Sequence, residues 1–193
     1  MSQTQQPSPV AIRHATRLEI PAITPIIAAA LAQYRNEVPA AMFDAYVANS
    51  CNLVDRWDDA DVLVVKIDGR IAGTVTYFAD ASREGLGLPG DWAGFRTLAV
   101  HPSARGRGLG RRLIDRCLYE ARRYGVATLG IHTAAFMTAA CRLYDRAGFR
   151  RCDAYDLRAS DIFGVNASAG DVAVIAHRLD LVTSAARHPT RPP

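Results

Sequence analysis

The segment Arg105-Gly106-Arg107-Gly108-Leu109-Gly110 decides how this chain is interpreted. It stands between a run of strand-forming residues that ends at Val100 and an apolar stripe of helical spacing that begins at Leu109. In the first turn of a helix the backbone N–H groups lack partners, and the helix dipole adds partial positive charge. Glycine lets an anion approach this backbone closely and accepts positive φ angles. The segment is therefore predicted to bind phosphate.

Two other kinds of phosphate loop do not fit these residues. A dinucleotide fingerprint that starts at Gly106 would need glycine at position 111, which is Arg111. A P-loop would need Gly-Lys-Ser/Thr, which is absent. Four arginines fall within positions 105–112, an arrangement that suits a compact polyanion better than an extended phosphate backbone.

Length and composition indicate one compact α/β domain. The chain has 193 residues, of which 49% are hydrophobic and 22% are charged. We expect the domain to span residues 10–180, with disordered segments at 1–9 and 181–193. The longest apolar run, residues 26–32, is far shorter than the roughly 20 residues that cross a bilayer, and the first residues do not read as a secretory signal. These features predict a cytoplasmic protein without a membrane partner.

Composition also argues against nucleic acid and metal. The net charge of +4 could suggest a nucleic acid partner, but no aromatic and basic interleaving or recognition motif accompanies it. The four cysteines show no paired spacing of the zinc type. His14, His101 and His177 stand apart from any cluster with ligand spacing, so no metal is predicted.

Seven strands are expected from runs of β-branched and aromatic residues. Asp68-Gly69 is a strong two-residue hairpin signal between the second and third strands. The long stretch 79–91 contains four glycines or prolines and reads as a surface loop. The expected strands cover residues 10–13, 61–67, 70–78, 95–100, 128–133, 149–157 and 171–179.

Four helices are expected between these strands. Thr16 and Glu19 have capping-box spacing and open the first helix, which should kink or restart at Pro25 with Thr24 as a second cap. Pro39 suits the first turn of the second helix. The third runs from Leu109 to the glycine at 125, and the fourth covers 138–147.

Two motifs give the chain a family resemblance. Leu98-Ala99-Val100-His101-Pro102 is followed by Arg105-x-x-Gly108-x-Gly110, and a later segment reads Ala140-x-x-Leu143-Tyr144-x-x-x-Gly148-Phe149. This pattern resembles the GNAT superfamily of acyl-CoA-dependent N-acyltransferases. The resemblance covers about residues 10–179, with its diagnostic motifs in 95–149. It implies an α/β fold of the α+β type, with a mixed, mostly antiparallel six- to seven-stranded sheet flanked by about four helices.

The resemblance also implies a co-substrate and a site. Acetyl-CoA would be bound, with Tyr144 close to its sulfur atom as the acid that protonates the leaving thiolate. Strand residues would face the pantetheine arm and supply an N–H for the developing oxyanion, while the loop would hold the pyrophosphate. The implied cofactor-binding residues are Leu98, Ala99, Val100, Arg105, Gly106, Arg107, Gly108, Leu109, Gly110 and Arg111.

The sequence departs from the family pattern at two positions. Many relatives carry a glutamate as general base on the strand before the loop, and the corresponding position here is Gly94. Asp91, Glu84 and His132 remain as candidates, of which His132 has the most suitable intrinsic chemistry or else is a structural residue at a strand end. Met137 stands where relatives often have an asparagine that contacts the cofactor arm.

The expected function is transfer of an acetyl group from acetyl-CoA to a primary amine of a small molecule or peptide, by direct attack in a ternary complex. The alternative is a catalytically silent acetyl-CoA-binding sensor or regulatory protein, which the missing strand glutamate supports. Acceptor recognition is expected from residues 34–51, 79–91 and 156–171. A homodimer is compatible with the sequence.

Overall fold

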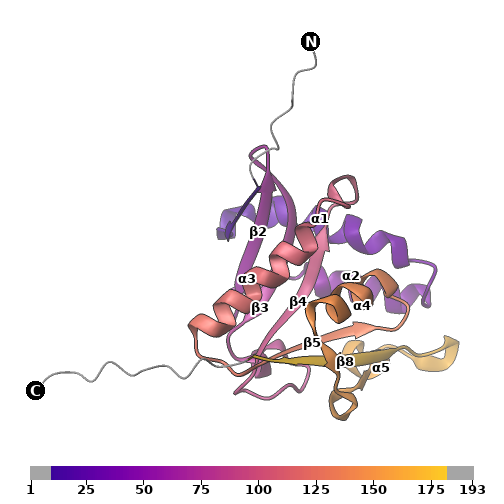
Figure 1. Ribbon diagram of the computed structural model, residues 1–193. Coiled ribbons are helices and arrows are strands. Elements are labelled where there is room, and N and C mark those ends of the chain that lie inside the picture. The colour runs from indigo at the N-terminus through magenta and orange to yellow at the C-terminus, as the bar shows by residue number, and fades with distance from the viewer. Residues whose placement is uncertain (1–9, 182–193) are drawn as a thin grey trace, which may run out of the picture.

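A computed structural model describes residues 10–181 and shows one mixed sheet covered by helices on both faces (Figure 1). The segments 1–9 and 182–193, where disorder is expected from the sequence, lie outside the described residues. The strand order is β1-β2-β3-β4-β5-β8-β6, and β7 also pairs with β8. The described strands are β1 Val10–His14, β2 Asp61–Ile67, β3 Arg70–Phe78, β4 Ala93–Val100, β5 Thr128–Ala134, β6 Arg150–Arg151, β7 Leu157–Arg158 and β8 Ala173–Asp180. The described helices are α1 Ile20–Leu31, α2 Ala40–Cys51, α3 Leu109–Arg123, α4 Thr138–Ala147 and α5 Ala159–Phe163.

The expected fold class is confirmed, with slightly higher counts of strands and helices. The predicted hairpin is present between β2 and β3. Asp68 and Gly69 have φ angles of 50° and 76°, as the favoured two-residue hairpin turn requires. This turn sets the register of the two strands.

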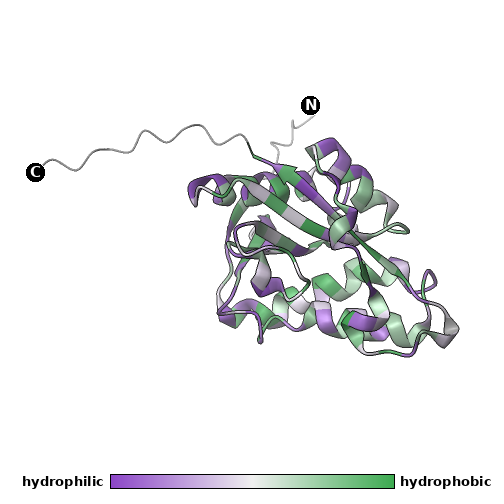
Figure 2. Cartoon of the chain, turned by 90° about the horizontal axis from the view of Figure 1, so that it is seen from below, coloured by the Kyte–Doolittle hydropathy of each residue, from purple (hydrophilic) through white to green (hydrophobic). Residues whose placement is uncertain are grey.

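The sheet is buried on both faces by two apolar clusters. Along β2, Leu63 and Val65 face the cluster that contains α3, whereas Val62 and Val64 face the cluster that contains α1. Successive side chains of a strand point to opposite faces, so a continuous apolar run is expected where both faces are covered. The helices carry both hydrophilic and hydrophobic residues (Figure 2). This mixture is typical of helices that pack one face on the sheet and expose the other face to solvent.

The parallel pair β4 and β5 creates an opening in the sheet. The two strands are paired only at Ala93 with Leu129 and at Gly94 with Gly130. Beyond these pairs β4 continues along β3, while β5 continues along β8. The backbone edge of β4 after Gly94 is therefore left without a strand partner on the β5 side.

A β-bulge bends β4 close to this opening. The register with β3 shifts between Thr74 and Thr76, and Thr97 has a φ angle of 53°, in the left-handed region. A bulge inserts an extra residue and re-aims the neighbouring side chains. It therefore changes the direction of the side chains that follow Arg96.

The expected restart of the first helix at Pro25 is wrong. Helix α1 runs through Pro25, and Thr24 does not cap a second helix. Its hydroxyl instead donates to the carbonyl oxygen of Ile20 at 3.0 Å, so it is satisfied within the preceding turn. The Thr16 and Glu19 signal does open this region, because the Glu19 carboxylate accepts from the Thr16 backbone N–H at 2.9 Å.

The expected strand at 149–157 is also wrong as one continuous element. Two short strands, β6 and β7, flank a single 3-10 turn at Asp153–Tyr155. Arg151 and Asp156 close this turn with two hydrogen bonds of 2.8 and 2.6 Å.

The stretch 79–91, expected to be a surface loop, contains a 3-10 helix, Ala81–Glu84. Among the described residues no helix has the length and apolar character that crossing a membrane would require.

Candidate functional site

The loop that precedes α3 presents a row of backbone amides without protein partners. Gly106 and Gly108 have φ angles of 76° and 72°, and Gly108 is the residue that precedes the helix. At the start of the helix the Arg112 N–H donates to the Gly108 oxygen at 3.1 Å. Within residues 10–181 none of the amides of 106–111 donates to another part of the chain. Such converging donors form an anion-binding site.

The three loop glycines are needed for different reasons. A Cβ atom added at Gly106 or Gly108 would meet no heavy atom within 4 Å, so these positions border open space and require glycine for their positive φ. A Cβ atom at Gly110 would lie 3.0 Å from Cδ2 of Leu143, so Gly110 allows α3 to approach α4. Together they border an open groove of about 560 Å³ between the loop and α4.

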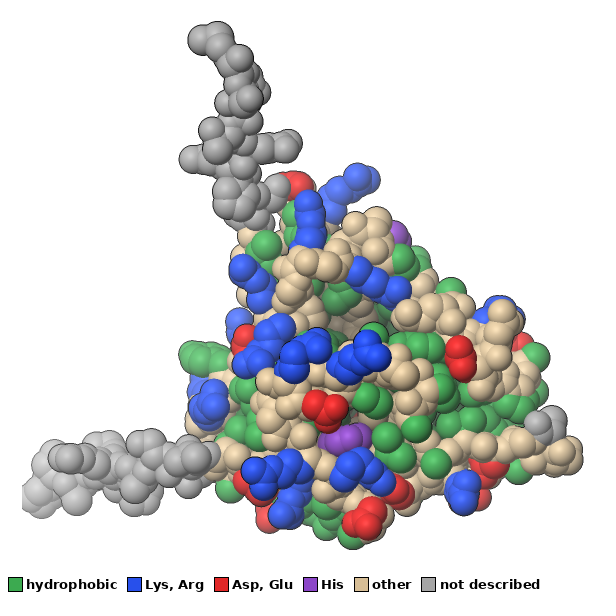
Figure 3. All heavy atoms as spheres, turned by 45° about the vertical axis from the view of Figure 1, so that its right-hand side comes forward, with side chains coloured by type: hydrophobic (Ala, Val, Ile, Leu, Met, Phe, Trp, Pro, Cys, Tyr) green, Lys and Arg blue, Asp and Glu red, His purple; other side chains and the backbone are tan. Residues whose placement is uncertain are grey.

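The arginines around this groove have different roles. Arg105 donates to the Ala30 oxygen at 3.1 Å and to the Gln33 side chain at 3.2 Å, so it ties the loop to the C-terminal end of α1. Arg111 pairs with Asp115 at 2.8 Å. Arg107 makes no hydrogen bond or ion pair within the described part of the chain and stays free for a ligand. Basic side chains gather on the face shown in Figure 3.

Arg146 is a groove residue that the sequence analysis missed. It lies in the last turn of α4 and lines the groove with the glycine loop. Its backbone oxygen accepts from Arg111 at 3.3 Å, which joins the two helices. The only sequence signal is its position within the Ala140–Phe149 motif, which does not state that α4 packs beside the start of α3.

The free edge of β4 leads from the groove into the sheet. Val100 lines the groove, and Leu98 is half-buried beside it, whereas Ala99 is buried against the α1 side. Thr97 and Leu98 have no partner in the β3 register because of the bulge. Their backbone groups can therefore bond to a polar chain that enters between β4 and β5.

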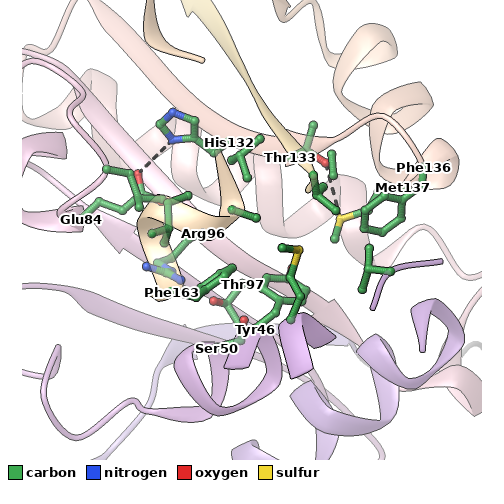
Figure 4. Close-up of a pocket in the computed structure, with 18 residues that line it drawn as sticks. Tyr46, Ser50, Glu84, Arg96, Thr97, His132, Thr133, Phe136, Met137 and Phe163 are labelled. Atoms are coloured by element: carbon green, nitrogen blue, oxygen red, sulfur yellow. Dashed lines mark hydrogen bonds and ion pairs between the residues drawn. The ribbon is translucent and has the colours of Figure 1, made fainter. Parts of the chain in front are cut away.

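A second, smaller cavity of about 90 Å³ lies on the other side of this opening (Figure 4). Helix α2 contributes three residues one turn apart, and α5, β5 and the segment before β4 complete the wall. Most of its lining is apolar. The main lining residues are Met42, Tyr46, Ser50, Glu84, Leu86, Arg96, Thr97, His132, Thr133, Phe136, Met137, Ile162, Phe163, Val172 and Val174.

Glu84 and His132 meet in this cavity. Nδ1 of His132 lies 4.0 Å from Oε2 of Glu84, and the exposed fractions of the two side chains are 4% and 1%. Nε2 of His132 lies 3.0 Å from the backbone oxygen of Tyr155. A carbonyl only accepts, so Nε2 carries the proton in the neutral ring and Nδ1 offers its lone pair.

This pair lacks hydrogen-bond donors. Nδ1 of His132 and both carboxylate oxygens of Glu84 are buried without a hydrogen-bond partner among the described residues. Buried polar groups are costly unless they are paired. The arrangement suits a ligand that brings N–H groups, such as an amine, to both residues.

The structure does not bring Asp91 to this cavity. Asp91 is exposed and does not contribute to the cavity wall, while Glu84 and His132 do. Met137, at the position where the family pattern has asparagine, also lines the cavity, and its sulfur accepts from the Thr133 hydroxyl at 3.7 Å. Of the three residues considered as general base, only Glu84 and His132 line this cavity.

Tyr144 lies in α4 within an aromatic cluster. Its ring centroid is 5.9 Å from that of Phe95 and 5.8 Å from that of Phe149. Burial raises the pKa of Tyr144 far above its ordinary value, and the nearby Tyr46 and Cys141 raise it further. The phenol therefore remains protonated at neutral pH, which is the state that a proton donor needs.

Comparisons with known proteins agree with this geometry. The model of the "Acetyltransferase (GNAT) family" matches residues 25–149. A mycothiol acetyltransferase from Cellulomonas flavigena is 36% identical over 49% of this chain, and the N-alpha-acetyltransferase RimI of Mycobacterium tuberculosis is 33% identical over 54%. The matched regions span 28% and 66% of those two proteins.

A solved structure extends the likeness to nearly the whole chain. The yncA protein of Salmonella typhimurium, solved with its cofactor acetyl-CoA, superposes with a TM-score of 0.62. The match covers 92% of this chain and 96% of that protein at 24% identity. At this identity the likeness supports the fold.

Proposed function

The chain belongs to the GNAT acetyltransferase family, and we propose that it transfers an acetyl group from acetyl-CoA to a primary amine by direct attack in a ternary complex. The observation that carries this proposal is the row of unpartnered amides at 106–111, which opens onto the free edge of β4. A diphosphate fits the amides, and an amide-bearing pantetheine arm fits the strand edge.

Acetyl-CoA would be held by the chain's own residues in three places. The amides of Gly106 to Arg111 would bind the pyrophosphate, and Arg107 and Arg146 would add positive charge. Arg105 would act indirectly, because its guanidinium already fixes the loop to α1. The backbone of Leu98, Ala99 and Val100 would bond to the pantetheine arm.

The acceptor amine must lose a proton before it attacks. An alkylamine with a pKa of about 10.4 costs roughly 4 to 5 kcal/mol to deprotonate at pH 7. Nδ1 of His132 is the proposed base, since its lone pair faces the cavity while Nε2 is held by Tyr155. Glu84 would attract the ammonium and then stabilise the protonated imidazole.

Transfer is completed by two further groups. As the amine nitrogen bonds to the thioester carbon, negative charge develops on its oxygen, and a backbone N–H of the β4 bulge near Leu98 would stabilise that charge. When the carbon–sulfur bond breaks, the leaving thiolate would take a proton from the phenol of Tyr144, the acid that the family pattern implies. The nitrogen loses its second proton as the amide forms, and this proton would restore the phenol of Tyr144. The products are an amide and free coenzyme A, with one proton left on His132.

The proposal is tested by measuring binding and turnover separately. Calorimetry with acetyl-CoA tests the loop, and release of free thiol in the presence of a panel of small primary amines and short peptides tests the chemistry. We expect both binding and thiol release. Tight binding without thiol release for every acceptor would indicate a silent acetyl-CoA sensor instead, and absence of binding would overturn the proposal as a whole.

A further inference from the structure

Arg96 is a positively charged residue in the wall of the second, smaller cavity, which we call the acceptor cavity because the amine is proposed to bind there. It lies on β4 directly before the bulge at Thr97 and lines the same cavity as Glu84 and His132. Figure 4 shows these three polar residues toward one side of the cavity, with Phe136 and Met137 toward the other. A charged side chain in a mostly apolar wall is unusual unless it has a partner.

The partners of Arg96 within the protein do not neutralise it. Its guanidinium donates to Oδ1 of Asn49 on α2, and no carboxylate of residues 10–181 lies within 4.0 Å of it. The same Oδ1 also accepts from Arg56 at 3.0 Å. Two cations therefore share one neutral amide oxygen.

Arg56 already has a structural task. It donates to the backbone oxygen of Asn49 at 2.7 Å and to that of Asn52, and so it caps the C-terminal end of α2. Burial and the charge of Arg96 lower the pKa of Arg56 to about 10. The value is lowered first by burial and second by the charge of Arg96. Arg96 donates one hydrogen bond among the described residues, so most of its five N–H donors remain for another group.

We infer that Arg96 binds a carboxylate of the acceptor, so that the acceptor is an amino acid whose ammonium group lies at Glu84 and His132. This inference rests on the proposed function and specifies its acceptor. Guanidinium binds carboxylate with paired hydrogen bonds, and the Glu84 and His132 pair needs donors. The remaining wall, formed by residues such as Met42, Ile162 and Phe163, is apolar and suits an aliphatic or aromatic side chain.

The test compares acceptors that differ only in the carboxylate. Leucine is paired with isopentylamine and with leucinamide, and phenylalanine with 2-phenylethylamine, and kcat/KM is measured by thiol release from acetyl-CoA. Charged hydrogen bonds of this kind predict a preference of about 10- to 100-fold for the amino acid of at least one pair.

Variants locate this preference in Arg96. We expect Arg96→Met to lower kcat/KM for the amino acid by about 10- to 100-fold and to leave that for the plain amine within about twofold. Arg96→Lys should keep part of the preference, because lysine retains the charge without the planar fork. Arg70→Met is the matched control, since Arg70 is exposed in the β2–β3 hairpin and does not line the cavity.

The outcomes separate this inference from the proposed function. Equal kcat/KM for amino acids and plain amines in the wild-type protein would overturn the inference while thiol release upheld acetyl transfer. Arg96→Met and Arg96→Lys could instead lower kcat/KM equally for both acceptor types while acetyl-CoA affinity is retained. That result would show that Arg96 only holds α2 in place through Asn49, and it would also overturn the inference. Thiol release with no acceptor at all would overturn both.

Discussion

Gly94 on β4 and Gly130 on β5 form the last pair before these parallel strands separate. A Cβ atom on Gly130 would lie 2.9 Å from Cδ1 of Leu88, and one on Gly94 would lie 3.2 Å from Cβ of Ala81. The segment 79–91 therefore packs directly over the point where the sheet opens. This packing covers position 94 and places Glu84 in the cavity wall, so a carboxylate reaches the site from the loop rather than from the strand.

Replacing Gly94 by glutamate would not supply a working base. The new side chain would collide with Ala81 and press on the Gly130 backbone, and overpacking of this kind costs about 1 to 3 kcal/mol. We expect thermal unfolding to show Gly94→Glu destabilised well beyond Gly94→Ala, with no gain in thiol release. A gain in activity would show that the strand position remains open to the substrate.

Loss of the imidazole should affect turnover more than cofactor binding. His132→Gln is expected to lower kcat at pH 7 by about 10²- to 10⁴-fold, the usual contribution of a general base. Its remaining activity should keep rising with pH toward the pKa of the free amine, because only spontaneously deprotonated acceptor can react. Stopped-flow or steady-state thiol release over pH 6 to 10 checks both effects, and calorimetry should show unchanged acetyl-CoA affinity.

Asp91→Asn is the matched control for this carboxylate and imidazole pair. Asp91 is exposed and outside the cavity, whereas Glu84 is buried within it. We expect Asp91→Asn to retain wild-type kcat and KM and Glu84→Gln to raise KM for the amine. If Asp91→Asn lowered kcat or raised KM while Glu84→Gln had no effect, Asp91 would be the better candidate for the general base.

Two glycines, one before and one after α3, allow a direct test of the phosphate-binding loop. Gly108 and Gly125 flank α3, have φ angles of 72° and 70°, and border open space. Aspartate costs each about 1 kcal/mol of backbone strain, but only Gly108→Asp adds a carboxylate beside the amides of the groove. Calorimetry should show acetyl-CoA binding weakened at least about 100-fold by Gly108→Asp, at a cost equivalent to one strong charged contact, and little changed by Gly125→Asp. If the two variants bound acetyl-CoA with equal affinity, the loop would have no role in cofactor binding.

Tyr144→Phe removes the proposed acid and keeps the aromatic cluster. The ring contacts with Phe95 and Phe149 remain, so stability should change by less than about 1 kcal/mol. We expect kcat to fall by about 10²- to 10⁴-fold because the thiolate loses its proton donor. Tyr119→Phe, at an exposed position on α3, serves as the control and should be silent.

Glu19 links stability to pH at the start of α1. Hydrogen bonds from Arg13 at 2.7 and 2.6 Å, and one from the Thr16 N–H, lower the pKa of Glu19 from 4.5 to about 2. A depressed pKa means that the stabilisation is complete above pH 4.5 and is lost as pH falls toward 2. Urea unfolding should therefore show Glu19→Gln less stable than wild type at pH 7, with a difference that shrinks between those two values. A constant difference would assign the effect to packing.

The sequence by itself determined the features that depend on neighbouring residues. Glycines at 106, 108 and 110 between a strand and an amphipathic helix require a loop with free amides, since positive φ angles and unpaired first-turn N–H groups are local properties. Asp68 and Gly69 determined the hairpin for the same reason. The motifs from Leu98 to Phe149 extended this local chemistry to the family and to the fold class.

Tertiary structure alone decided which side chains line the cavity proposed to bind the acceptor. Glu84 comes from a 3-10 helix within an expected loop and meets His132 only because that loop packs over Gly94 and Gly130. Arg96, directly before the bulge at Thr97, contacts Asn49, which lies 47 positions earlier on α2. These placements depend on bulges and on packing between distant segments, so they arise only when the whole sheet has formed.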